Sequence, residues 1–302
     1  MNAEQQHSGR AGLAYGLAAY AWWGSAVPIY LHALSQGTWS ADPMELLAQR
    51  VWFGLPLVLG LLALRGRMGE LRAALGDRRM LGTLLVSSAL LVANWFAFIW
   101  AVGNDRLLDS SLGYYLNPLV SVALGMLVLG ERPRRLQLAA IGMCVVAVAW
   151  LTYQRGSLPW VAVTVALSFG MYGLVRKRAT VKPMPGLCVE LIILLPLMAG
   201  IYAALFSAGR AEILDGRPVQ MGLMALSGVM IVVPLLWFAA AAHRLRLATL
   251  GMLQYIGPSG QFLLALYYGE ALNRHTLATF VVIWIALGLY SWDAWRGTRG
   301  TG

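Results

Sequence analysis

The chain has 302 residues, of which 59% are hydrophobic and only 12% are charged, and its formal net charge is +10. In an ordinary soluble domain, roughly a quarter of all residues are charged. The composition therefore excludes a soluble globular protein and predicts an all-α integral membrane protein.

A helix that crosses a bilayer needs about 20 mostly apolar residues. The first apolar segment follows Arg10, but it is too long for a signal peptide and lacks a small-residue cleavage site, so we expect it to be retained. Cys144 and Cys188 lie inside apolar segments and are interpreted as small buried hydrophobic residues. In chain order, ten predicted spans lie at 11–31, 44–64, 80–102, 110–129, 136–153, 158–175, 186–207, 218–242, 249–268 and 276–295.

The basic residues follow the positive-inside rule, by which Lys and Arg collect on the cytoplasmic side of a membrane protein. With a cytoplasmic N-terminus, 17 of the 23 basic residues fall in inner segments and five fall in outer loops. The remaining one, Arg50, lies inside the second span. Membrane orientation thus explains the basic charge. We predict that both termini are cytoplasmic and that the chain does not bind nucleic acid.

The two halves of the chain resemble each other. The segment LLAQRVWFGLPLVLG (46–60) overlays PGLCVELIILLPLMAG (185–200) at an offset of 140, which places Pro56 on Pro196 and Arg50 on Glu190. We predict a tail at 1–10, a five-helix repeat at 11–153, a second repeat at 158–295 and a tail at 296–302. Five is an odd number, so the second repeat enters the membrane from the opposite side.

Inverted repeats are a recurrent design of transporters that work by alternating access. We therefore predict a transporter in which the two repeats surround a central cavity. A channel or a membrane scaffold is kept as an alternative.

Arg50 and Glu190 are charges inside predicted spans, where charges are expensive and normally face a polar interior. One interpretation places them at opposite gates of one cavity. The alternative is that each long side chain reaches its own membrane interface. Pro56 and Pro196, on the same two spans, are interpreted as hinge or packing residues.

Pro118 and Pro258 lie near the middle of the fourth and ninth spans, where a proline frees the carbonyl group four residues earlier. Irregular backbone at membrane depth is tolerated where it faces protein or a water-filled cavity. We therefore expect a binding wall here, with kinked helix packing as the alternative. The candidate wall residues are Tyr114, Tyr115, Asn117, Gln254 and Tyr255.

Three further residues are candidates for the cavity. Asn94 lies midway along the third span and either contacts the substrate or forms hydrogen bonds between helices. Trp23 and Tyr172 precede glycines in related motifs of the two halves, and they either stack on an apolar substrate or belong to the core.

Gly130-Glu131 and Gly269-Glu270 close the fourth and ninth spans. Glycine can end a helix, and the following glutamate can face the N-terminus of the next helix. We interpret both pairs as structural.

The motif GPSG at 257–260 matches the G-x-S-G pattern of an intramembrane serine protease. A nucleophilic Ser259 needs a base within hydrogen-bond reach, and the histidines His7, His32, His243 and His275 lie outside the spans or at their ends. The protease is therefore a remote alternative, and we expect neither an enzyme nor a metal or cofactor.

Several strings are distinctive: NWFAFIWAVGNDRLLDSSLGYYLNPLVSVALGMLVLGER, SFGMYGLVRK, RLRLATLGMLQYIGP and YYGE. With these strings and the duplication, the chain resembles the EamA family of the drug/metabolite transporter superfamily, and within it the RarD, or chloramphenicol-sensitive protein, group. The resemblance implies a secondary transporter of the bacterial inner membrane for a small metabolite or an amphiphilic drug-like molecule. It also implies that the first four helices of each half surround the cavity and that the fifth and tenth are peripheral. Proton coupling and a homodimer are left open.

Overall fold

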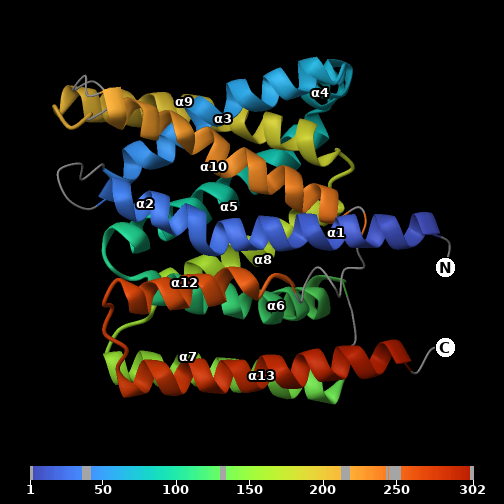
Figure 1. Cartoon of the computed structure of the whole chain (residues 1–302), viewed down its shortest axis with the longest axis vertical. Helices are drawn as coiled ribbons and strands as arrows, with labels where there is room; N and C mark the ends of the chain where they lie inside the picture. The colour runs from blue at the N-terminus through green and yellow to red at the C-terminus, as the bar shows by residue number, and fades with distance from the viewer. Residues whose placement is uncertain are drawn as a thin grey trace.

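The computed structural model describes residues 3–35, 42–129, 134–211, 218–242, 244 and 253–299. All regular elements in these ranges are helices, most of which run side by side along one direction (Figure 1). The beginning of α1 and the end of α13 lie at the same end of the bundle, which we call the terminal end. The other end is called the opposite end.

The first predicted span, at 11–31, lies within α1 (Ala3–Ala21), the π-helical turn η1 (Trp22–Ala26) and α2 (Val27–Ser35). Gly24 lies inside the π turn, and a Cβ atom there would be 2.8 Å from the carbonyl oxygen of Gly257. Glycine therefore allows η1 and the ninth predicted span to approach at backbone contact. Single π turns within longer helices are frequent at functional sites, and no sequence pattern predicted this one.

Helices α3 (Pro43–Leu64) and α5 (Arg78–Gly103) correspond to the second and third predicted spans. Asp42 caps α3 by accepting a hydrogen bond from the Met44 amide, and Asp77 caps α5 in the same way. Such caps satisfy amides that have no partner within the helix. The short helix α4 (Met68–Gly76) connects the two, and α6 (Leu107–Leu129) follows α5.

The second half begins with the sixth predicted span. The last helix of the first half is α7 (Arg135–Arg155). The helices of the second half are α8 (Trp160–Arg178), α9 (Pro183–Ser207), α10 (Pro218–Ala242), α12 (Ile256–Tyr267) and α13 (Arg274–Arg299). Helix α12 begins at Ile256, so Pro258 lies in its first turn, directly after a turn at Gln254 and Tyr255.

The irregular backbone expected at Pro118 is absent, because α6 is helical from Leu107 to Leu129. A proline removes one helical hydrogen bond, and neighbouring elements can stabilise the remaining turns. Pro56 and Pro196 likewise lie inside continuous helices.

The helices form two groups that resemble each other. In one group α8 packs on both α5 and α6, and in the other the first span packs on both α10 and α12. Helices α3 and α9 pack on each other and join the groups. Helices α7 and α13 form a pair at the edge of the bundle (Figure 1).

Five of the described helices are long and apolar enough to cross a membrane, which supports a multi-pass membrane protein. They cover Pro43–Leu64, Arg78–Gly103, Arg135–Gln154, Pro183–Ser207 and Met221–Phe238. Two shorter apolar helices cover Trp160–Arg176 and Arg274–Tyr290. The full count of ten spans stays a prediction.

Candidate functional site

Arg50 is buried among aromatic side chains in the interior of the bundle. Its side chain lies on α3 and is 4% exposed, and its Cζ atom is 5.6 Å from the centre of the Trp95 ring. Its electrostatic neighbours are the phenol groups of Tyr30 and Tyr114. Arg50 thus packs into the bundle, against helices of its own half.

Hydrogen bonds hold the two phenol groups in place. The Tyr30 hydroxyl donates to the carbonyl oxygen of Leu223 on α10 at 2.9 Å. The Tyr114 hydroxyl donates to Oδ1 of Asn94 at 3.0 Å. Asn94 Nδ2 in turn donates to the Val165 carbonyl and to Ser168 Oγ, each at 3.2 Å. Asn94 therefore ties α5, α6 and α8 together, and it also positions one wall of the Arg50 environment.

Glu190 lies at the position of α9 that corresponds to Arg50 and is fully buried. Its carboxylate accepts a short hydrogen bond from Ser87 Oγ and a longer one, at 3.4 Å, from the Tyr172 hydroxyl. Arg176 Nη1 lies 3.5 Å from Glu190 Oε1. A Cβ atom at Gly186 would lie 2.3 Å from the same guanidinium nitrogen, so this glycine makes room for the ion pair.

The two charges that sequence reasoning paired therefore have different surroundings. Glu190 has an arginine, a serine and a tyrosine as partners from α8 and α5. Arg50 is surrounded by aromatic rings, and within the described ranges no carboxylate lies at ion-pair distance from it. No sequence pattern predicted that Trp95 and Tyr30 are neighbours of Arg50 or that Arg176 is the partner of Glu190.

Asn117 lies one turn after Tyr114 on α6, and residues three apart on a helix share a face. It is 1% exposed, and both polar atoms of its amide lack a hydrogen-bond partner in the described part of the chain. Buried amides are nearly always hydrogen-bonded in folded proteins. Among the described residues, no protein group therefore satisfies the hydrogen-bonding capacity of this buried amide.

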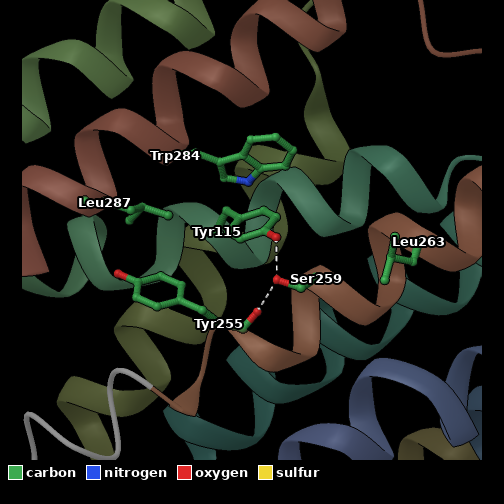
Figure 2. Close-up of a pocket in the computed structure, with 7 residues that line it drawn as sticks. Tyr115, Tyr255, Ser259, Leu263, Trp284 and Leu287 are labelled. Atoms are coloured by element: carbon green, nitrogen blue, oxygen red, sulfur yellow. Dashed lines mark hydrogen bonds between the residues drawn. The ribbon is translucent and has the colours of Figure 1, made fainter.

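Tyr115 points away from the Arg50 environment and, with Tyr255, lines a pocket of about 500 Å³ between α6, α12 and α13. Figure 2 shows the Tyr115 hydroxyl hydrogen-bonded to Ser259 Oγ, which also donates to the Tyr255 carbonyl. Trp284 and Leu287 of α13 form the apolar side of this pocket. Adjacent helical residues project in different directions, so the structure does not bring the candidate wall residues to one surface.

The other candidates lie near the π turn and α12. The Trp23 ring forms a cluster with the rings of Tyr20 and Phe238, with centroid distances of 5.7 and 5.9 Å from Trp23 and 6.1 Å between the other two. The Trp23 carbonyl accepts a hydrogen bond from Gln261 at 3.5 Å. Gln254 is half-buried in the turn before α12.

Glu270 makes a contact between the two halves that was only partly predicted. Its carboxylate accepts hydrogen bonds from the backbone amides of Leu107 at 2.6 Å and Leu108 at 2.9 Å, so it caps the N-terminus of α6. We expected it to face the next helix, which is α13, but the Asn273 side chain caps that helix. Gly269 has φ of +82° and ends α12, as predicted. Gly130 and Glu131 lie outside the described residues.

Comparisons with known proteins agree with a membrane transporter. The family model of the EamA-like transporter family matches residues 10–153. An uncharacterized transporter of Pseudomonas aeruginosa is 42% identical, over 96% of this chain and 96% of that protein. Protein RarD of Escherichia coli is 38% identical, over 97% of both chains. A solved protein structure has the same fold, with a TM-score of 0.59 and 18% sequence identity. The match covers 93% of this chain and 97% of the chain in that structure.

Proposed function

Because the chain belongs to the RarD group of the EamA-like transporter family, we propose that it is a secondary transporter that works by alternating access. It would move a small metabolite or an amphiphilic drug-like molecule across the bacterial inner membrane, with both termini cytoplasmic. The names of its relatives fit a transporter and not an enzyme.

Helices α3 and α9 give the strongest support for two inverted repeats. Pro43 begins α3 and Pro183 begins α9, and a charged residue, Arg50 or Glu190, follows seven residues later in each. At a rise of about 1.5 Å per residue, each charge lies about 10 Å from the start of its helix. The two helices run in opposite directions in Figure 1, so the charges approach the centre from opposite ends.

The packing of the helices supports the same duplication. In the proposed repeats, the first span (α1 and η1) corresponds to α8, α3 to α9, α5 to α10 and α6 to α12. When each helix is replaced by its counterpart, the α1–α10 contact becomes the α8–α5 contact, and the η1–α12 contact becomes the α8–α6 contact. The same exchange turns the α3–α10 contact into the α9–α5 contact. We propose that the two helix groups rock against each other, so that the site opens at one end of the bundle at a time.

Contacts between the halves occur at both ends of the bundle and are suited to act as gates. At the opposite end, Glu270 caps α6 and Arg210 pairs with Asp42. At the terminal end, Lys182 Nζ lies 2.7 Å from Glu70 of α4. Alternating access requires that such contacts at one end can break while those at the other end persist.

A counterflow experiment tests the proposed function. A thermal-shift screen of the purified protein against amino acids, nucleosides and amphiphilic drugs first identifies a solute that binds, because a bound ligand stabilises the folded state. Vesicles preloaded with this solute should then accumulate its radiolabelled form transiently. If the solute only runs down its concentration gradient and the radiolabelled form never accumulates, the result would instead support a channel.

Reporter fusions test the predicted orientation. A reporter fused after Gly37 should lie outside the cytoplasm, and a reporter fused after Gly302 should lie inside it. The same location for both fusions would contradict the ten-span topology.

A further inference from the structure

The charge of Arg50 has no counter-charge within the described part of the protein. The residue is 4% exposed, its guanidinium lies over the Trp95 ring, and its other electrostatic neighbours are two neutral phenol groups. The pseudo-equivalent Glu190 serves as an internal comparison, because the protein supplies it with Arg176 as a counter-ion. Of these two equivalent positions, the described part of the chain therefore supplies a counter-ion to Glu190 and none to Arg50.

Burying an ion without a partner is strongly unfavourable, and buried charges in proteins are normally paired. A cation–π contact with Trp95 offsets part of the cost but does not neutralise the charge. Arginine keeps its proton at any physiological pH, so loss of the charge is not an alternative. A negatively charged ligand would provide the missing partner.

We propose that Arg50 is the anchor of the substrate site and that the substrate is an organic monocarboxylate with an apolar or aromatic body. This inference rests on the proposed transport function. A guanidinium binds a carboxylate through two parallel hydrogen bonds.

The surroundings of Arg50 favour this class of ligand over others. One guanidinium balances one negative charge, which suits a monocarboxylate better than a doubly charged phosphate. The rings of Trp95, Tyr30 and Tyr114 provide apolar surface for the body of the ligand, as in most small-molecule sites. The unsatisfied amide of Asn117, on the same face of α6 as Tyr114, offers one additional polar contact.

Ligand binding to purified full-length protein tests the proposal. The probes are phenylacetate, its neutral analogue phenylacetamide, its cationic analogue phenethylamine, and inorganic phosphate, each measured by the shift in unfolding temperature and by equilibrium dialysis at neutral pH. Phenylacetate should bind and stabilise the wild-type protein, and the other three probes should not. Binding of phenethylamine or phenylacetamide as tight as that of phenylacetate would overturn the proposal.

Substitutions at Arg50 identify the anchor. Arg50→Met should weaken phenylacetate binding about 100-fold or more, because the counter-charge is lost. Arg50→Lys should weaken it roughly tenfold, because the charge remains without the paired hydrogen bonds. Arg274→Met makes the same chemical change at an exposed position and should bind like the wild type. The unfolding transition of each variant shows whether it is folded. Equal affinity of the folded Arg50→Met and Arg274→Met proteins for phenylacetate would overturn the proposal.

The proposal and the transport function fail in different ways. Counterflow of a cationic or neutral solute, with no phenylacetate binding, would leave a transporter but overturn the carboxylate site. Arg50-dependent phenylacetate binding without counterflow would support the carboxylate site and contradict the transporter.

Discussion

The different surroundings of Arg50 and Glu190 predict opposite effects on stability when each charge is removed. Glu190→Ala removes the counter-ion of Arg176 and leaves a guanidinium in a largely buried position, where its side chain is 16% exposed. Arg50→Met removes a charge that has no counter-ion among the described residues, and it keeps most of the side-chain volume against Trp95. The first change should destabilise the protein, and the second should leave its stability unchanged or increase it.

The expected size follows from what is known of buried ion pairs. Removal of one partner of a buried pair costs about 3–5 kcal/mol, whereas replacing buried charge by apolar groups of similar volume is often neutral or stabilising. Arg176 retains some contact with solvent and also donates a hydrogen bond to the Pro183 carbonyl oxygen at 3.4 Å, so we expect about 2–3 kcal/mol for Glu190→Ala. At about 2 °C for each kcal/mol in a chain of this size, the unfolding temperature should fall by about 4–6 °C.

The assay can use the natural cysteines. Cys144 and Cys188 are 3% and 0% exposed, so a thiol-reactive fluorophore should label them only as the protein unfolds. Unfolding temperatures are compared for the wild type, Glu190→Ala and Arg50→Met in the same detergent. Arg50→Met should lose transport even though it stays folded. An equal loss of stability in both variants would refute the contrast between paired and unpaired charge.

Three further predictions concern the helix contacts. Glu270→Ala should lower stability by about 1–3 kcal/mol in the same assay, because two amides of α6 lose their acceptor; an unchanged unfolding temperature would contradict the cap. Gly260→Ala should cost about 1–3 kcal/mol by overpacking, since its Cβ atom would lie 2.6 Å from a carbonyl oxygen of η1, whereas Gly222→Ala, with no atom within 4 Å of the new Cβ, should cost nothing. Equal effects of the two alanines would contradict the close approach. Hydrogen bonds and charges from Arg67 and Lys182 lower the pKa of Glu70 from 4.5 to about 2. Its stabilising contribution should therefore be complete above about pH 4.5 and be lost as the pH falls towards 2, and a difference between wild type and Glu70→Gln that does not shrink in this range would refute the coupling.

The helical membrane architecture could be predicted because apolar segments of bilayer length dominate the sequence. Caps such as Asp42 and the helix end at Gly269 also follow from local rules. The π turn at Gly24 and the continuity of α6 through Pro118 could not be predicted in this way. Both depend on neighbouring helices that are distant in the chain.

The candidate site was predictable as a set of unusual residues but not as a set of contacts. Arg50 and Glu190 were evident because charges within apolar segments are rare. The sequence gives no direct signal that Trp95 lies under Arg50 or that Arg176 pairs with Glu190, since those contacts form between helices. The direction of a side chain around its helix also separates Tyr114 from Tyr115, which sequence proximity had grouped together.

The most direct test of alternating access measures both ends of the bundle in the same protein. Spin labels are attached in a cysteine-free chain at one of two pairs of sites, and distances are measured by pulsed electron paramagnetic resonance. The pair Asn104 and Ala271 reports on the opposite end, and the pair Arg79 and Arg244 on the terminal end. We predict that each pair shows two distances and that a bound ligand shifts the distances of the two pairs in opposite directions, since only one end opens at a time. A single unchanged distance for each pair, or simultaneous opening of both ends, would contradict it.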